Sequence, residues 1–183
     1  VMEEIAMVTP IYGGVSYDRL GIEGLQWPCP SKDHPGTGIL HAEKFSIGLA
    51  RFRPVEHKEP FEAPDNEFPM LLTTGRSLYH FHTGTMTRRT SLLEREVPGP
   101  YIEMNPEDAQ KAGIRNGQKV IVESRRGRLY MDAKLTLDIP KGTLFVPFHF
   151  NEACANVLTG QALDPQSKIP EFKVTAARVR RAD

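Results

Sequence analysis

Residues 68–90 read FPMLLTTGRSLYHFHTGTMTRRT, and this stretch decides how the rest of the chain is interpreted. A short apolar run, Met70 to Leu72, ends in two threonines and Gly75, which is typical of a buried strand followed by a sharp turn. Residues 76–90 then carry guanidinium, imidazole and hydroxyl groups without a periodic apolar pattern. Such donors, together with backbone N–H groups freed by glycine, are what a phosphate or pyrophosphate needs. The sequence therefore predicts a site for a large anion directly after a strand.

Two other interpretations of this stretch stay open. A strand, a turn and a solvated polar loop would have the same composition without binding anything. A metal site is the second alternative, because His80 and His82 would share one face of a strand. No Cys, Asp or Glu stands between Leu71 and Leu93, however, so the pattern does not favour zinc or iron. We therefore assign no metal ligand in this chain.

The composition indicates one core-forming domain plus an extension. The chain has 183 residues, 39% of them hydrophobic, and a formal net charge of zero. This balance argues against nucleic acid as a partner, and no apolar run approaches the roughly 20 residues of a membrane helix. The two cysteines, Cys29 and Cys154, stand far apart and exclude a cysteine-rich scaffold. The acidic start lacks a signal-peptide pattern, so we expect a cytoplasmic protein, although a chain that begins on Val can be a fragment.

Residues 1–66 are predicted to be an extended arm and linker, and residues 67–183 a β-barrel domain. Pro and Gly interrupt the first part too often for long regular elements. Within it we expect a short helix near residues 13–20 and a strand over residues 45–52. Residues 54–69, rich in Pro, Glu, Asp and Asn, are typical of a linker.

The second part carries strong signals for short elements and tight turns. Asn105 is a helix cap, Pro106 takes the first turn and Gly113 ends the helix. Alternating apolar residues on both sides of a Gly-containing turn predict a hairpin. The expected strands cover residues 119–123, 129–137, 143–148 and 173–179, and a second brief helix covers residues 151–158. This pattern predicts a mainly β protein with short helices, forming a small barrel rather than a doubly wound sheet.

Several motifs extend along nearly the whole chain. Residues 71–89 are followed by Asn-Pro-Glu-Asp-Ala, Ser-Arg-Arg-Gly, Val-Pro-Phe-His-Phe, Ala-Asn-Val-Leu-Thr and Asp-Pro-Gln-Ser-Lys-Ile-Pro, and preceded by Gly-Val-Ser-Tyr-Asp-Arg. Together they resemble the C-terminal domain of molybdopterin oxidoreductases, most closely that of formate dehydrogenase α subunits. The resemblance implies a six-stranded double-psi β-barrel, here preceded by the extended Pro- and Gly-rich arm. It also implies that this barrel binds the molybdopterin guanine dinucleotide cofactor.

The resemblance further implies which residues contact the cofactor. The family's cofactor loop falls on residues 74–83, its aromatic position near the reaction pocket on Phe148, its Asn on Asn156 and its late Lys on Lys173. A pyrophosphate suits Arg76 and the turn N–H groups, and an amide such as Asn156 can meet a heterocycle edge with donor and acceptor together. The implied cofactor-binding residues are Thr74, Gly75, Arg76, Ser77, Leu78, Tyr79, His80, Phe81, His82, Thr83, Phe148, Asn156 and Lys173.

The resemblance implies part of an enzyme rather than a complete one. The family's iron–sulfur cysteines, its metal-binding Cys or selenocysteine and its formate-handling residues lie upstream of this region, so no catalytic residue is placed here. Molybdenum or tungsten and the cluster would be carried by the intact catalytic subunit, with electron-transfer subunits as further partners. The implied reaction is two-electron oxidation of formate to carbon dioxide, and this chain alone is expected to be inactive. The same domain of a nitrate reductase, or a stand-alone pterin-binding module without turnover, are the alternatives.

Overall fold

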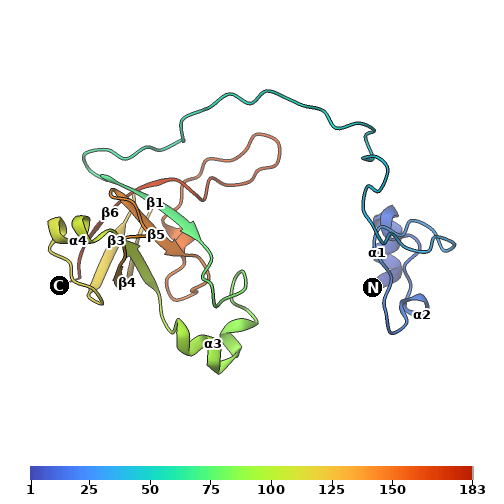
Figure 1. Ribbon diagram of the computed structural model, residues 1–183, viewed down its shortest axis with the longest axis horizontal. Coiled ribbons are helices and arrows are strands. Elements are labelled where there is room, and N and C mark those ends of the chain that lie inside the picture. The colour runs from blue at the N-terminus through green and yellow to red at the C-terminus, as the bar shows by residue number, and fades with distance from the viewer. Residues whose placement is uncertain (183) are drawn as a thin grey trace. The chain divides into compact units, whose positions relative to one another are not determined.

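The computed structural model describes residues 1–182, which form two compact units, one of residues 1–56 and the other beginning at residue 57. The first unit contains helices α1 (Met2–Val8) and α2 (Tyr17–Leu20) and the 3₁₀ turn η1 (Pro10–Tyr12) (Figure 1). The expected helix near residues 13–20 is thus present in shorter form as α2. The expected strand over residues 45–52 is wrong, because only a single bridge joins Phe45 to Gly48, whose positive φ of 88° turns the backbone there. The predicted division at residues 66 and 67 stays a prediction.

Arg19 links several backbone segments of the first unit through its guanidinium. Its guanidinium donates hydrogen bonds to the backbone carbonyls of Gly14 and His34 and lies 3.6 Å from the sulfur of the buried Cys29. Gly14 is required at this point, because a Cβ there would lie 1.9 Å from the carbonyl oxygen of Ser31. The half-buried Arg19 and its carbonyl partners therefore contribute to holding this unit together, alongside backbone hydrogen bonds such as that from the Gly14 N–H to the Cys29 carbonyl.

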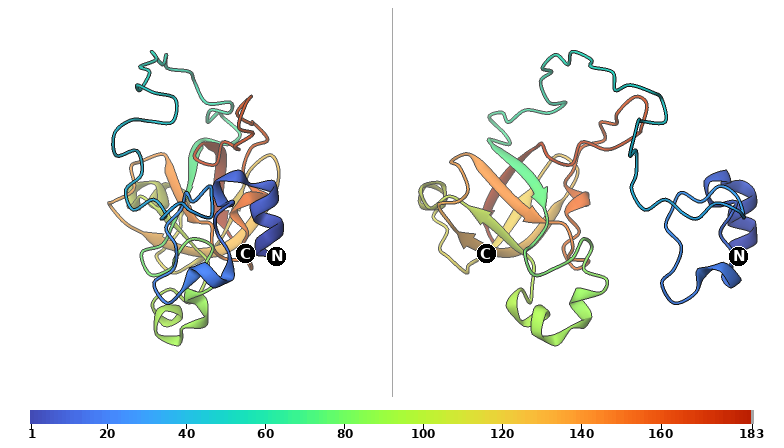
Figure 2. Two further views of the ribbon diagram at one scale, coloured as in Figure 1. Left: turned by 90° about the vertical axis from the view of Figure 1, so that its right-hand side faces the viewer. Right: turned by 45° about the vertical axis from the view of Figure 1, so that its right-hand side comes forward.

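The second unit is a closed barrel of six strands, in the order β1-β5-β2-β4-β3-β6 (Figure 2). The strands are β1 (Met70–Gly75), β2 (Tyr101–Met104), β3 (Lys119–Glu123), β4 (Arg128–Leu135), β5 (Thr143–Pro147) and β6 (Thr175–Arg181). Strands β1 and β5, and likewise β2 and β4, pair in parallel, while the other neighbours are antiparallel. Short helical pieces connect them, namely η2 (Thr87–Arg89), α3 (Ser91–Glu96), α4 (Pro106–Ala112) and η3 (Ala155–Val157). This architecture confirms the expected mainly β fold with a six-stranded barrel.

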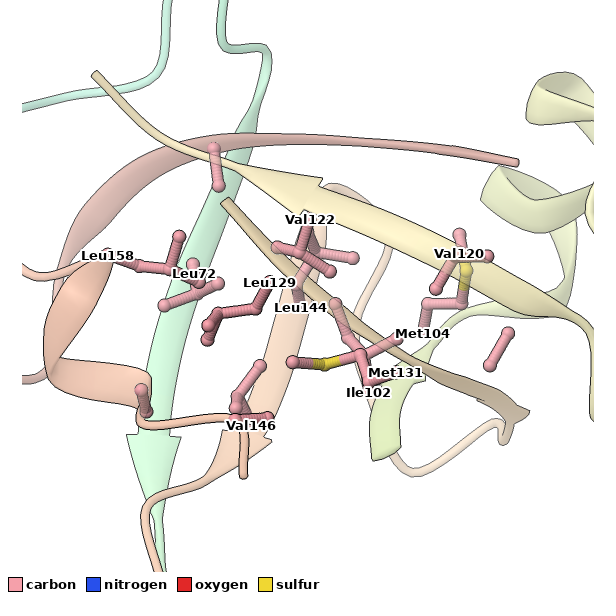
Figure 3. Packing of buried hydrophobic residues seen from close by; sticks show 14 of the residues in the cluster. Leu72, Ile102, Met104, Val120, Val122, Leu129, Met131, Leu144, Val146 and Leu158 are labelled. Carbon is pink, nitrogen blue, oxygen red and sulfur yellow. The ribbon is translucent and has the colours of Figure 1, made fainter. Parts of the chain in front are cut away.

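Apolar side chains from every strand fill the barrel (Figure 3). In β4 the alternation is clear, because Leu129, Met131 and Ala133 point inward while the residues between them are partly or fully exposed. Fully burying one side chain such as Leu72 or Leu144 contributes about 1.5–3 kcal/mol to stability. The barrel is therefore a packed core, and its ends, rather than its interior, are available for a ligand.

Local signals predicted several elements of the barrel correctly. The side-chain oxygen of Asn105 accepts a hydrogen bond from the Glu107 N–H at 3.0 Å, and Gly113 ends α4 with a left-handed φ of 65°. Strands β3 and β4 form the expected hairpin. Two expectations need correction: the helix over residues 151–158 is only the 3₁₀ turn η3, and the closing strand covers residues 175–181. Within the described residues, no helix has the length and apolar character of a membrane span.

The segment that leads into the barrel is fixed by ion pairs. The carboxylate of Glu62, whose side chain is 11% exposed, accepts hydrogen bonds from Arg125 at 2.7 Å and Arg126 at 2.5 Å. It also accepts the backbone N–H of Ala176 in β6 at 3.4 Å. Burial alone would raise the pKa of Glu62, but the hydrogen bonds from Arg126 and Arg125 outweigh it and hold that pKa below its ordinary value.

Candidate functional site

The parallel pairing of β1 with β5 places two loops at one end of the barrel. Gly75 stands opposite Pro147 at the last position of the register, so both strands end at the same edge. Residues 76–90 follow β1, and the segment that begins with Phe148 follows β5. The two segments are joined where they begin, because the Phe148 N–H donates a hydrogen bond to the Gly75 carbonyl at 3.1 Å. Gly75 itself is buried, and a Cβ there would lie 2.4 Å from the Phe145 ring. Sterics therefore require glycine at this point.

A cavity of about 540 Å³ lies where these loops meet. Three segments far apart in the sequence form it: residues 74–83, residues 148–156 and residues 172–173. Its lining residues are Thr74, Arg76, His82, Thr83, Phe148, Asn156, Phe172 and Lys173. All of them except Phe172 belong to the cofactor-binding set predicted from the sequence. The structure thus brings these predicted residues together around one cavity.

The third segment is tied to the first by two reciprocal hydrogen bonds. The Lys173 ammonium donates to the backbone carbonyl of Thr74, and the Thr74 hydroxyl donates to the backbone carbonyl of Phe172 at 2.8 Å. Phe172 was missed because its only sequence signal is its position beside Lys173. Phe172 nevertheless adds an aromatic residue to the lining of the cavity.

The loop after β1 reverses direction at two residues with left-handed backbone. His82 has a φ of 51° and Gly84 a φ of 74°. The reversal presents His82 and Thr83 to the cavity, where the imidazole of His82 meets the Phe148 ring edge-on at 5.7 Å between centroids. Side chains of both loops therefore define the shape of the cavity.

Arg76 lies between this cavity and a second one. The second cavity, of about 620 Å³, is lined by Arg76, Ser77, Leu78 and Tyr79 together with residues of other segments, including Tyr101, Glu103 and Lys134. Within residues 1–182 the exposed guanidinium of Arg76 makes no hydrogen bond or ion pair. It is therefore available to an anion from either cavity.

Three predicted residues line neither cavity. Gly75 is buried beside the Phe145 ring, and Phe81 is 63% exposed. His80 is 3% exposed and turns inward, so that its Nδ1 lies 3.1 Å from the Thr87 hydroxyl. Whether Gly75, His80 and Phe81 contact the cofactor stays a prediction.

A partly exposed cluster of charged residues adjoins the loop, and the sequence pattern did not reveal it. Arg88 pairs with Glu94 of α3 at 2.9 Å and with Glu152 at 2.6 Å, and it lies over the Phe150 ring. The hydrogen bond from Arg88 lowers the pKa of Glu152 to about 2. Arg88 was counted from sequence among the anion donors of residues 76–90, but its guanidinium is already engaged by two carboxylates. No signal within residues 68–90 identifies these partners.

A metal site was the alternative left open for His80 and His82. The structure places the two imidazoles in different surroundings, since His80 is buried while His82 faces the cavity. Among the residues that the structure describes, no three His, Cys, Asp or Glu side chains are grouped in a way that could hold a metal ion.

Comparison with known proteins identifies the family. Residues 70–176 match the family model described as the Molydopterin dinucleotide binding domain. The chain belongs to this family. The match begins with the first residue of β1 and ends in β6, so it contains the loop, Phe148, Asn156 and Lys173.

Two relatives and one solved structure show how far the similarity extends. The F420-dependent formate dehydrogenase 1 subunit alpha of Methanococcus maripaludis is 51% identical over 99% of this chain and 27% of the relative. The assimilatory nitrate reductase catalytic subunit of Bacillus subtilis is 41% identical over 92% of this chain and 24% of the relative. Acetylene hydratase from Pelobacter acetylenicus superposes with a TM-score of 0.56 at 22% identity, over 63% of this chain and 19% of the hydratase, and shares the fold. The chain thus spans about a quarter of the length of these relatives.

Proposed function

We propose that this chain is the molybdopterin guanine dinucleotide-binding portion of a larger molybdenum or tungsten oxidoreductase of the formate dehydrogenase type. The observation that carries the proposal is the cavity in which Arg76, Thr83, Asn156 and Lys173 converge from three distant segments. Its donor set suits a dinucleotide, because the cavity combines cations and a hydroxyl for phosphates with an amide for a heterocycle edge.

Each cavity residue has a distinct proposed role toward the cofactor. Arg76 and Thr83 would bind the pyrophosphate, Asn156 would meet the donor and acceptor edge of a ring, and Lys173 would add positive charge. Phe148 would pack against an apolar face of the ligand. When bound, the cofactor would supply the two-electron redox chemistry, while these residues hold and orient it.

Formate is the proposed substrate of the parent enzyme. Three F420-dependent formate dehydrogenase alpha subunits of methanogens are 48–51% identical to this chain over 99% of its length, whereas the nitrate reductase of Bacillus subtilis is 41% identical and a putative formate dehydrogenase of Staphylococcus aureus 33%. The parent reaction would be oxidation of formate to carbon dioxide with release of two electrons and a proton. The rest of the catalytic subunit would contribute the metal ligand and an iron–sulfur cluster, and electron-transfer subunits would accept the electrons. We propose a cytoplasmic location for this assembly.

Nucleotide release and metal analysis test the cofactor assignment. Acid treatment of the purified catalytic subunit is expected to release guanosine monophosphate, together with molybdenum or tungsten detected by mass spectrometry. A preparation that is active but releases no guanine nucleotide would contradict the assignment. Assays with dyes on formate and on nitrate then test the substrate, and reduction of nitrate without oxidation of formate would favour the nitrate reductase alternative. The isolated chain of 183 residues is expected to show no turnover on either substrate.

A further inference from the structure

A pair of buried imidazoles connects the two loops behind the cavity. The ring centroids of His80 and His149 lie 4.5 Å apart, and both residues are at most 4% exposed. His80 belongs to the loop that presents His82 and Thr83 to the cavity, and His149 directly follows the cavity residue Phe148. The imidazole pair (His80 and His149) does not line the cavity itself, but its ring contact links the two segments whose neighbouring residues do line it.

His80 fixes the turn to which it belongs. Its Nδ1 lies 3.1 Å from the hydroxyl of Thr87, and the same hydroxyl accepts the Phe81 N–H at 3.2 Å. The turn also packs closely against its surroundings, because a Cβ on Gly84 would lie 2.9 Å from Arg88 and 3.5 Å from the His149 ring. Because these groups are closely packed, a displacement of His149 would also displace residues 80–87.

His149 occupies a place suited to a neutral ring. Neither of its ring nitrogens has a hydrogen-bond partner within the described residues, and its ring packs 3.9 Å from that of Phe150 between centroids. The titratable and charged groups around it are His80 of the loop, Arg88 of η2, Glu94 of α3 and Glu152 of the segment after β5. Burial, followed by the proximity of His80 and Arg88, lowers the pKa of His149 to about 4. The ring is therefore neutral at neutral pH.

We propose that His149 is a positioning residue for the cofactor loop: its neutral ring supports His80 and thereby holds residues 80–84 where His82 and Thr83 face the cavity. This inference rests on the proposed function, in which that cavity receives the dinucleotide. A proton on His149 would place a second cation beside Arg88 in a buried position. The loop is then displaced, because the buried ring has no hydrogen-bond partner for that charge among the described residues.

The sign of the pH effect follows from proton linkage. We call the arrangement with the loop in place the closed form and the arrangement with the loop displaced the open form. In the closed form the pKa of His149 is about 4, whereas a solvated imidazole, as expected in the open form, has a pKa near 6.5. The open form thus binds the proton more tightly, and closure is lost as pH falls through this interval. For one proton, the opening equilibrium should increase about tenfold per pH unit between about pH 6 and about pH 4.

Amide hydrogen exchange on the full 183-residue chain measures this opening directly. Protection factors of residues 80–88, corrected for intrinsic exchange, should fall about tenfold between about pH 6 and about pH 5. His149→Phe should lose most of this dependence, and His149→Leu serves if the larger ring is not tolerated. His57→Phe is the matched control, because the side chain of His57 is 81% exposed, and it should behave as the wild type. A wild-type loop with constant protection, or His149 variants that keep the full pH dependence, would overturn the proposal.

Cofactor release from the loaded catalytic subunit provides the second measurement. The wild type should lose guanine nucleotide faster at about pH 5 than at about pH 7, and His149→Phe should reduce this difference. Release independent of pH in the wild type, alongside pH-dependent loop opening, would show that the imidazole pair does not position the cofactor. If the wild-type subunit contains no guanine nucleotide, the proposed function fails, while the exchange experiment still decides whether His149 holds the loop.

Discussion

Lys173 and Thr74 stand 99 positions apart in the sequence, yet the Lys173 ammonium donates a hydrogen bond to the backbone carbonyl of Thr74. The Thr74 hydroxyl donates in turn to the carbonyl of Phe172 at 2.8 Å. This exchange brings the segment before β6 onto the end of β1. It thereby adds the third side of the cavity, and it makes one lysine responsible both for the shape of the site and for part of its charge.

Lys173→Gln is expected to lower cofactor retention about tenfold or less. The variant loses a charge-assisted hydrogen bond, but the lysine is exposed and water replaces part of what is lost. Guanine nucleotide content after gel filtration measures the effect. Lys168→Gln is the matched control, because Lys168 is exposed and its ammonium donates a local hydrogen bond to the Pro165 carbonyl. Equal nucleotide content in the two variants would remove Lys173 from the site.

Arg76→Ala is expected to lower the affinity for the dinucleotide about 10- to 100-fold, because hydrogen bonds to charged groups contribute about 1.5–3 kcal/mol each. The free energy of unfolding of the chain should change by less than about 0.5 kcal/mol, since Arg76 is exposed and makes no ion pair among the described residues. Arg89→Ala, at another exposed arginine of the same loop, is the control and should retain the cofactor. A loss of stability with unchanged cofactor content would show that Arg76 is structural.

Asn156→Asp is expected to have a larger effect on retention than Lys173→Gln, about 30-fold or more. The substitution keeps the shape but replaces an amide donor by a negative charge that faces an anionic ligand, which costs on the order of 2 kcal/mol. Urea denaturation of the chain should be unchanged, because the Asn156 side chain makes no hydrogen bond within the described residues. Asn151→Asp, at a nearby exposed position, is the control. Full cofactor content in Asn156→Asp would contradict the assignment.

Glu62→Gln is expected to destabilise the barrel unit by about 1–3 kcal/mol, because Arg125 and Arg126 lose their carboxylate. Since the folded-state pKa of Glu62 is lowered, the wild type has this contribution above the ordinary carboxyl pKa of about 4.3 and loses it as pH falls further. Urea midpoints measured from neutral to acidic pH should therefore converge for wild type and variant. Glu59→Gln, whose side chain is 86% exposed, should match the wild type throughout.

Asn105→Ala is expected to destabilise the fold by about 1–3 kcal/mol, because two bonds are lost at a buried position. The Asn105 oxygen caps α4, and its amide nitrogen donates to the Ile139 carbonyl at 2.9 Å. Thermal unfolding of the chain measures the loss, with the exposed Asn66→Ala as the control. A melting temperature equal to that of the control would show that the cap is replaced by water.

The sequence predicted what depends on neighbouring residues. The helix of Asn105 and Gly113 and the hairpin of β3 and β4 follow from caps, turns and alternation over short distances, and they are present as expected. Strand β2 was missed because it has only four residues, Tyr101–Met104, and alternation over so short a run is indistinct. Local pattern predicted a small barrel and an anion site after its first strand, whereas the six-stranded barrel type and the dinucleotide cofactor were implied by the family resemblance.

The two histidines show where local reasoning fails. A spacing of two places both side chains on one face only if the backbone is extended, but His82 adopts a left-handed φ of 51°. One imidazole is therefore buried against His149 while the other faces the cavity. Which of them turns inward depends on Thr87 and His149, and the second of these lies in a different segment of the barrel. Contacts between residues so far apart in the sequence, such as His80 and His149, do not produce a periodic pattern from which they could be predicted.

The position of β6 in the barrel determines when the site can exist during synthesis. This last strand pairs with both β1 and β3, so a nascent chain that lacks it exposes two unpaired strand edges. The β1–β6 contact spans about a hundred residues, a non-local closure of the kind that slows folding. Phe172 and Lys173, which line the cavity, lie two or three positions before β6 in the sequence. The proposed cofactor site is therefore complete only after β6 has been synthesised and has paired with its two neighbours.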